Sequence, residues 1–467
     1  MFDFIKNKKH IHFIGIGGSG MYPLAQILHK QGFCITGSDN NETVTLDAVR
    51  KMGITVFGQH KTENIKGADL VIYSSAISDE NPELRAARES NIAVHDRAEL
   101  LGLFTSRHEK AVCVVGTHGK TTVTSMLVHI LLAAELDISA FVGGKLKILG
   151  GSARIGNSGI MAVEACEFNR NFLKLSPDIT VILNIDEDHM DCFKNMDNLR
   201  KAYTDFCNLT SDLLIMNGDD INTRVAVINS NFRKKIITFG FDRKNDYFPQ
   251  NIKKESFGSS FELYRNGELL GEIKISVPGE HNIINAVAAC AAALSAGADL
   301  NSLKKGLLEF TGAGRRFEQI YSNNGITVVD DYAHHPAEIS ATLNAAKGMS
   351  SGRIWAVHQP FTFSRTALLL DDFAEVLSLA DKVVLTDIMG GREDNTYGIK
   401  SEDLADKIPD AVVISDFKSG SVENNIRFEP VSEYIAQNAR SGDLIITMGC
   451  GDVDKAARLI AEKFQKA

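Results

Sequence analysis

The segment 109–134, EKAVCVVGTHGKTTVTSMLVHILLAA, decides the fold class. Its apolar run 111–115 predicts a buried strand, and the apolar stretch 123–134 predicts a long helix. A glycine-containing loop joins the two. A strand, a loop and a helix in this order are typical of parallel α/β sheets, whose ligands bind where the strands end. The loop is therefore the first candidate site.

This loop has the residue types of a phosphate-binding loop but not the usual spacing. The common pattern is G-x-x-x-x-G-K-[ST], yet Val114 stands five positions before Gly119, and the nearest upstream glycine is only three positions back. Lys120 is placed to neutralise phosphate charge, and the Thr121 hydroxyl is placed to ligate Mg²⁺. Two interpretations stay open: a nucleotide loop of another kind, or a turn that contains Gly-Lys-Thr. The candidate residues are Gly116, Thr117, His118, Gly119, Lys120, Thr121 and Thr122.

Units of strand, polar turn and helix recur along the whole chain. The runs KHIHFIGIGG, DLVIYSSAI, DITVILNIDEDH, GITVVDDYAHH and GDLIITMGCGD each place glycines or polar residues directly after an apolar strand. A chain of 467 residues is also too long for one ordinary core. The pattern predicts an α/β protein of three domains, with boundaries at 1–106, 107–313 and 314–467.

A second glycine loop lies near the start of the chain. The run GIGGSG places Gly15, Gly17 and Gly20 between a predicted strand and a predicted helix, and Asp39 follows 19 residues after Gly20. Glycines allow close backbone approach, and a helix N-terminus attracts a diphosphate. NAD and a UDP-sugar both carry a diphosphate and a ribose, so the motif does not choose between them. A tight turn without a ligand also stays open.

Acidic residues follow two further predicted strands of the central block. Glu164 ends the strand in GIMAVEAC, and residues 186–188 with His189 follow the strand in DITVILNIDEDH. If these strands are neighbours in a parallel sheet, Glu164 and His189 converge beside Thr121. Mg²⁺ usually takes one or two carboxylates together with phosphate and water oxygens. The sequence therefore predicts a nucleotide and metal site at this edge of the sheet.

Composition limits the partners and the compartment that we expect. The chain has 59 acidic and 50 basic residues, a net charge of −9, which speaks against nucleic acid or an anionic membrane as the main partner. No apolar run approaches the roughly 20 residues that span a bilayer, and the first run, MFDFIKNKKHIHFIGIGG, shows no apolar signal core followed by a cleavage site. The seven Cys are scattered and form no C-x-x-C pair, which predicts free thiols in a reducing cytoplasm.

Eight spaced motifs connect the central and later blocks to one family. In chain order they are GTHGKTT, EAC, NIDEDHMD, HNIINAVAA, GAGRRFE, DDYAHHPAE, HQPFTFSRT and GCGD. With GIGGSGM and GSD in front, the chain resembles the Mur ligases over nearly its whole length. The resemblance implies a Rossmann-like N-terminal domain for a UDP-sugar, a central P-loop-type ATPase domain and a Rossmann-like C-terminal domain. It also implies that L-alanine is joined to UDP-N-acetylmuramate while ATP, with two Mg²⁺ ions, becomes ADP and phosphate.

The resemblance assigns roles to the residues at matching positions. Lys120 contacts the ATP phosphates, and the metal ligands are Thr121, Glu164 and His189. The adenine contacts are His281 and Asn285, the ribose contact is Asp331 and a further phosphate contact is Arg316. His334 and Arg365 are expected at the end of the site that holds L-alanine and the acyl phosphate. The catalytic candidates are therefore Lys120, Glu164, His189, His334 and Arg365. The residues expected around the UDP-sugar are Gly17, Gly18, Ser19, Gly20, Met21, Asp39, Ser74 and Ser75.

Two motifs depart from the pattern of many relatives. Where those read E-A-D-E-S-D this chain reads EACEFN, so Cys166 replaces an acid while Glu164 and Glu167 remain. Where they read H-Q-P-H-R-Y-T-R-T, Phe361 and Thr362 replace a His and an Arg. Arg365 is then the arginine best suited to bind the carboxylate of the amino acid.

Four other functions compete with this one. A peptide-recycling ligase of the same family attaches a preformed peptide, but its first loop usually reads G-I-C-G-T rather than GIGGSGM. Folylpolyglutamate synthase resembles only the later blocks. An NAD-dependent dehydrogenase explains GIGGSG and Asp39 but leaves GTHGKTT, Glu164 and His189 without a role. A non-catalytic nucleotide sensor keeps the loops but needs no amino-acid end.

Overall fold

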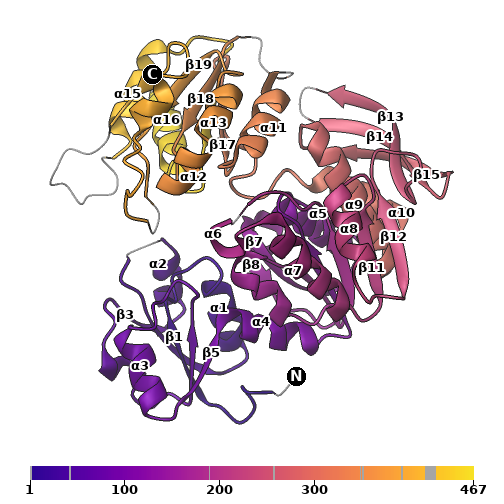
Figure 1. Ribbon diagram of the computed structural model, residues 1–467, viewed down its shortest axis with the longest axis vertical. Helices are drawn as coiled ribbons and strands as arrows, with labels where there is room; N and C mark the ends of the chain where they lie inside the picture. Colours follow the sequence, from indigo (N-terminus) through magenta and orange to yellow (C-terminus); the bar gives the residue numbers. More distant parts are fainter. Residues whose placement is uncertain are drawn as a thin grey trace. The chain divides into compact units, whose positions relative to one another are not determined.

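The computed structural model describes residues 3–41, 44–188, 190–255, 258–347, 349, 352–390, 393–415 and 427–466. The strands form three separate sheets, each within one of the three predicted segments. Figure 1 shows each sheet with its helices, coloured along the chain. This confirms the expected three-part α/β fold, while the predicted boundaries stay predictions. Within the described ranges, no helix has both the length and the apolar character needed to cross a membrane.

The N-terminal sheet has five parallel strands in the order β3-β2-β1-β4-β5. The helices begin where local signals predict: Asn81 accepts hydrogen bonds from the first turn of α3, and Asp96 with Glu99 forms a capping box at the start of α4. The strands are β1 His10–Ile14, β2 Cys34–Ser38, β3 Thr55–Phe57, β4 Leu70–Tyr73 and β5 Ala93–Asp96. The helices are α1 Tyr22–Lys30, α2 Val44–Lys51, η1 Thr62–Ile65, α3 Pro82–Glu89 and α4 Arg97–Ser106.

The central sheet has ten strands in the order β15-β14-β13-β12-β11-β10-β6-β9-β7-β8. Its middle strand, β6, pairs in parallel with β10 on one side and β9 on the other. The strands are β6 Lys110–Val115, β7 Ser139–Leu146, β8 Gly151–Arg154, β9 Ile160–Glu164, β10 Ile179–Ile182, β11 Leu213–Asn217, β12 Lys235–Phe239, β13 Tyr247–Glu255, β14 Gly258–Arg265 and β15 Glu268–Ile275. The helices are α5 Lys120–Ala133, η2 Lys147–Leu149, η3 Phe168–Lys174, α6 Met190–Phe193, α7 Met196–Leu209, α8 Ile221–Ile228, α9 Glu280–Ala296 and α10 Leu300–Glu309.

The C-terminal sheet has six strands in the order β16-β17-β21-β18-β19-β20, with β16 antiparallel to β17 and the others parallel. Alternate residues of β18 enter two cores: Ile354 packs with α11 and α13, and Trp355 packs with α15 and α16. The strands are β16 Glu318–Asn323, β17 Ile326–Asp331, β18 Ile354–His358, β19 Lys382–Leu385, β20 Val412–Val413 and β21 Leu444–Met448. The helices are α11 Pro336–Lys347, α12 Phe363–Leu368, α13 Leu370–Leu377, α14 Ser401–Ala405, α15 Glu429–Asn438 and α16 Asp454–Lys466.

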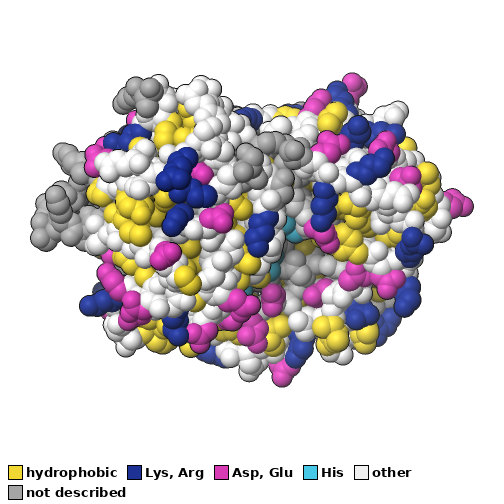
Figure 2. All heavy atoms as spheres, turned by 90° about the horizontal axis from the view of Figure 1, so that it is seen from above, with side chains coloured by type: hydrophobic (Ala, Val, Ile, Leu, Met, Phe, Trp, Pro, Cys, Tyr) yellow, Lys and Arg dark blue, Asp and Glu magenta, His cyan; other side chains and the backbone are white. Residues whose placement is uncertain are grey.

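The chain divides into two compact units. The first comprises Met1–Asn251, Phe261–Ile273 and Ile284–Phe310, and the second comprises Ile252–Ser260, Lys274–Ile283 and Thr311–Ala467. One hydrophobic core in the first unit joins residues of the N-terminal and central sheets, such as Phe13 of β1 and Val163 of β9. On the face drawn in Figure 2, basic and acidic side chains are interspersed.

Candidate functional site

The loop between β6 and α5 requires its two glycines. Gly116 and Gly119 have φ angles of 150° and 84°, which L side chains rarely adopt. A Cβ at Gly116 would lie 2.9 Å from Leu183 Cβ, and one at Gly119 would lie 2.8 Å from Asn285 Oδ1. The loop therefore turns sharply between the segment after β10 and helix α9, and it presents Lys120 as the first residue of α5.

Lys120 folds back against this loop and pairs with a buried carboxylate. Its Nζ donates to the carbonyl oxygens of Gly116 and Thr117 and to Glu167 Oε1 at 3.0 Å, while Glu167 Oε2 lies 2.9 Å away. Burial disfavours the ammonium, but the nearby negative charge of Glu167 outweighs this and raises the pKa of Lys120. Lys120 is therefore charged at neutral pH and can exchange a carboxylate partner for a phosphate.

Thr121 and Glu164 meet where β6 and β9 end. Thr121 Oγ1 donates to Glu164 Oε1 at 2.9 Å, and the Gly143 N–H donates to Glu164 Oε2 at 2.6 Å. The two oxygen-bearing side chains have the donor chemistry that Mg²⁺ prefers. His189, the third predicted metal ligand, lies outside the described residues.

The segment after β10 holds the loop from its other side. Asn184 Oδ1 accepts from the His118 N–H at 2.8 Å, and Asn184 Nδ2 donates to the His118 carbonyl at 3.1 Å. The Thr117 hydroxyl accepts from the Asp186 N–H at 2.9 Å. β9 and β10 flank β6 rather than pairing with each other, so their ends reach the loop from opposite sides.

The N-terminal glycine loop is partly closed by its own hydrogen bonds. The Gly17 N–H donates to Asp39 Oδ2 at 3.0 Å, so the predicted ribose ligand braces the loop. The N–H groups of Ser19 and Gly20 donate to none of the described residues. The side chain of Met21 is 1% exposed and belongs to the core, so only its backbone can take part in a cradle.

Two further predicted contacts of the UDP-sugar follow β4. Ser74 Oγ accepts from the Ala76 N–H at 3.3 Å, and Ser75 is exposed. A Cβ added to Gly15 would lie 3.3 Å from Ser74 Cβ, so Ser74 lies beside the glycine loop.

The predicted adenine contacts both lie on α9. Asn285 is 9% exposed and its Oδ1 lies close to Gly119, as described above. His281 is exposed, one helical turn earlier. Asn285 therefore lies at the phosphate loop, and its assignment to adenine stays a prediction.

In the second unit, the predicted ribose and phosphate residues stand at the start and end of one loop-strand segment. Asp331 accepts from the Phe317 and Ala333 N–H groups, both at 2.7 Å, and burial raises its pKa to about 6. The Arg316 guanidinium lies 5.0 Å from the centre of the Tyr332 ring, and no hydrogen bond joins it to the described residues. Arg316 therefore remains available for a phosphate.

The two residues predicted at the L-alanine end also lie in the second unit. His334 Nδ1 lies 2.9 Å from the Tyr332 carbonyl oxygen and 3.3 Å from Glu338 Oε2. Arg365 lies on α12, which begins after Thr362: the Thr362 hydroxyl accepts from the Arg365 N–H. Thr362, one of the two departures from the family motif, therefore has a structural role as a helix cap.

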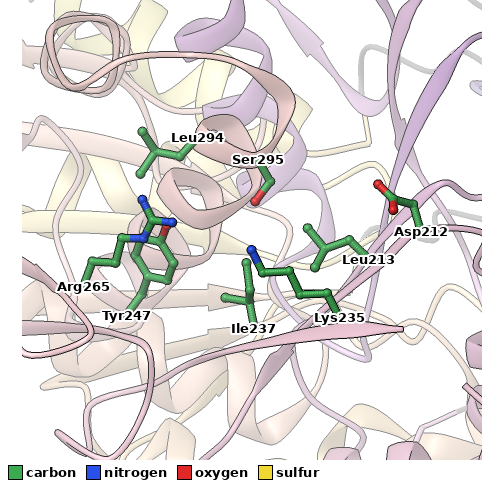
Figure 3. Close-up of a pocket in the computed structure, with 8 residues that line it drawn as sticks. All are labelled: Asp212, Leu213, Lys235, Ile237, Tyr247, Arg265, Leu294 and Ser295. Atoms are coloured by element: carbon green, nitrogen blue, oxygen red, sulfur yellow. The ribbon is translucent and has the colours of Figure 1, made fainter. Parts of the chain in front are cut away.

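A pocket of about 280 Å³ lies away from the loop, at the far end of α9 (Figure 3). It contains Ser295, which is ten residues or about 15 Å along α9 from Asn285. None of the predicted site residues lines it. Its lining residues are Asp212, Leu213, Lys235, Ile237, Tyr247, Arg265, Leu294 and Ser295.

Three residues that support the loop were not among the predicted site residues. They are Glu167, which pairs with Lys120, Asn184, which braces His118, and Gly143, which holds Glu164. Glu167 and Asn184 stand inside the EACEFN and NIDEDH motifs, so their places in the sequence were a signal. Gly143 lies in no motif, and only the pairing of β7 with β9 reveals it.

Known protein families match all three parts of the chain. Residues 10–109 match the model described as Mur ligase family, catalytic domain, 114–293 the Mur ligase middle domain, and 315–451 the Mur ligase, glutamate ligase domain. Together with the Lys-Thr loop and its carboxylates, these matches define an ATP-dependent ligase. The chain belongs to the Mur ligase family.

Relatives that are similar in sequence narrow the comparison to one kind of Mur ligase. The UDP-N-acetylmuramate–L-alanine ligases of Agathobacter rectalis and Caldanaerobacter subterraneus subsp. tengcongensis are 43% and 42% identical, over 95% and 98% of this chain and 96% and 98% of theirs. The crystal structure of the UDP-N-acetylmuramate–alanine ligase of Thermotoga maritima matches with a TM-score of 0.83 at 29% identity, covering 98% of this chain and 100% of that one. A murein peptide ligase of Psychrobacter arcticus shares the fold, with a TM-score of 0.73 at 23% identity.

Proposed function

We propose that this protein joins L-alanine to the carboxylate of UDP-N-acetylmuramate at the expense of ATP, in the synthesis of peptidoglycan precursors. The observation that carries the proposal is the loop geometry: Lys120 and Thr121 open α5, and Glu164 faces Thr121 at 2.9 Å. The similarity to L-alanine ligases over almost the full length supports the choice of substrates.

The chemistry explains why such a loop is needed. A carboxylate is a poor electrophile, so one of its oxygens first attacks the γ-phosphorus of ATP, and the bond to ADP breaks. The amine of L-alanine then attacks the acyl carbon, loses a proton and displaces phosphate. Both steps bring anions together, so catalysis depends on positioning and on charge neutralisation.

The residues of this chain divide that work. Lys120 neutralises the transferred phosphoryl group, and Thr121, Glu164 and His189 are the residues that would hold Mg²⁺. The ion, when bound, supplies charge that offsets the phosphate oxygens. The residues assigned to ATP are Arg316, Asp331, His281 and Asn285, and those assigned to L-alanine and the acyl phosphate are His334 and Arg365. The three proposed domains bind different ligands. Residues 1–106 bind the UDP-sugar, residues 107–313 bind ATP, and residues 314–467 contribute to binding ATP and L-alanine.

An omission experiment tests this function. The protein is incubated with ATP, Mg²⁺, UDP-N-acetylmuramate and L-alanine, and phosphate release is measured with each component left out in turn. We expect release to require all four, and mass spectrometry to find the alanyl product. Release that needs a preformed peptide instead of L-alanine would identify a recycling ligase, and no alanine-dependent release would refute the proposal.

A further inference from the structure

Arg97 lies against the N-terminal glycine loop and within electrostatic reach of Glu164 and Cys166 of the central sheet's edge. It is the first residue of α4, and the capping box of Asp96 and Glu99 fixes its backbone. Lys174 of η3 pairs with Asp96 and so ties this helix start to the central part of the same unit.

The side chain of Arg97 lies against the glycine loop. A Cβ added to Gly20 would stand 2.8 Å from Arg97 Nη1 and 3.2 Å from its Cζ. Glycine at position 20 is therefore needed for the guanidinium to approach the backbone this closely. This contact gives Gly20 a second role besides exposing its own N–H.

The guanidinium of Arg97 carries a charge, and the part of the chain that the structure describes offers it no hydrogen-bond acceptor. Five N–H groups belong to an Arg side chain, and among the described residues none accepts a hydrogen bond from Arg97. Burial lowers the pKa of Arg97, and the neighbouring Cys166 and Glu164 oppose this. A partly buried cation without hydrogen-bond partners is costly unless a ligand supplies the acceptors.

The backbone around Arg97 has donors of the same kind. Within the glycine loop the Gly17 and Gly18 N–H groups donate to Asp39 and to the Gly15 carbonyl, whereas those of Ser19 and Gly20 have no acceptor in the described chain. The first turn of α1 contains no acidic residue that would repel an anion. Free N–H groups and an adjacent guanidinium form a donor set for a phosphate.

We propose that Arg97 is a further substrate-binding residue, whose guanidinium holds the diphosphate of the UDP-sugar against the N–H groups of Ser19 and Gly20. This inference rests on the proposed function, because it assumes that the substrate is a UDP-sugar. The glycine motif predicts only backbone N–H donors for the diphosphate. Arg97, from a separate segment of the chain, adds a positively charged side chain to them.

Calorimetric binding of three probes to Arg97→Ala tests the assignment. UDP and UDP-N-acetylglucosamine carry the diphosphate without the lactyl carboxylate, and UDP-N-acetylmuramate carries both. We expect all three to bind about 10- to 100-fold more weakly, since a hydrogen bond to a charged group contributes roughly 1.5–3 kcal/mol. The KM for UDP-N-acetylmuramate should rise similarly, while the KM values for ATP and L-alanine stay unchanged.

Matched variants separate this role from a structural one. Arg88→Ala removes an exposed arginine of the same domain that pairs with Asp79, and it should bind all probes as the wild type does. Arg97→Lys, which keeps the charge, should recover part of the affinity. Without ligand, Arg97→Ala should melt at the wild-type temperature or higher, because it removes a cation that has no hydrogen-bond partner among the described residues; a purely structural Arg97 would give a lower melting temperature.

The outcomes distinguish this inference from the proposed function. If the wild type binds UDP and Arg97→Ala binds it equally well, the assignment of Arg97 is wrong and the function stands. If only UDP-N-acetylmuramate binding weakens, Arg97 serves the carboxylate and the diphosphate assignment is overturned. If the wild type binds no UDP compound and shows no alanine-dependent phosphate release, the proposed function itself fails.

Discussion

The folded state at the phosphate loop is stabilised by the ion pair between Lys120 and Glu167. The Lys120 side chain is 13% exposed and that of Glu167 is 2%, with 2.9 Å between Nζ and Oε2. At an effective dielectric constant of about 20, two unit charges at this distance attract by roughly 6 kcal/mol, and desolvation offsets much of this. Lys120→Met removes one partner and leaves a buried carboxylate, which typically costs about 3–5 kcal/mol.

We therefore expect Lys120→Met to lose turnover and to melt on the order of 10 °C below the wild type. The double variant Lys120→Met with Glu167→Gln carries no buried charge at this point. It should regain most of the melting temperature and remain inactive, because the phosphate ligand is still missing. The assays are differential scanning fluorimetry and alanine-dependent phosphate release, at pH 7.5 and fixed protein concentration.

Two results would refute this reasoning. Lys120→Met that melts within about 1 °C of the wild type would mean that Glu167 finds another partner or takes up a proton at little cost. A double variant that melts as low as the single one would mean that the lost stability comes from side-chain packing rather than from charge.

The remaining predictions concern two other positions. Gly143→Ala places a Cβ 2.5 Å from Glu164 Oε1 and should lower kcat about 100-fold by displacing that carboxylate, whereas Gly151→Ala, with nothing within 4 Å of its Cβ, should leave kcat unchanged. Burial lowers the pKa of His358 to about 4, below the usual 6.5. The neutral imidazole therefore contributes fully to the free energy of unfolding above pH 6.5, and this contribution is lost as the pH falls toward 4. At pH 5 the loss is roughly 2 kcal/mol, and His358→Gln, which can still donate to Met448, should show a smaller drop in melting temperature between pH 7.5 and pH 5; an equal drop contradicts the assignment.

The fold was predictable from the sequence because it depends on short-range patterns. The apolar run before Gly116 became β6, and the apolar stretch after Lys120 became α5. Parallel strands end at the same edge, so the sequence alone predicts Glu164 near Thr121. The observed contact at 2.9 Å follows from β9 pairing with β6.

Other parts of the site depend on tertiary packing that no local pattern encodes. Gly143 reaches Glu164 because β7 pairs with β9, and Arg97 reaches Gly20 because α4 packs beside the glycine loop. Asn169 and Arg170, just after Glu167, have left-handed φ angles of 52° and 54°, although neither is a glycine. Such a backbone is held in place by its surroundings rather than by residue preference.

The two loops of the first unit differ in whether the cation beside them already has a carboxylate partner. At the ATP loop, Glu167 accepts a hydrogen bond from Lys120, and Glu164 accepts one from Thr121. A bound triphosphate must therefore take the place of a carboxylate as the partner of Lys120. Lys120 is then paired before and after the exchange, and the loop keeps its shape. At the glycine loop, no carboxylate among the described residues pairs with Arg97, so a diphosphate would supply acceptors that those residues do not. UDP should therefore raise the melting temperature of the wild type more than that of Arg97→Ala at equal ligand concentration, because stabilisation by a ligand grows with its affinity for the folded state.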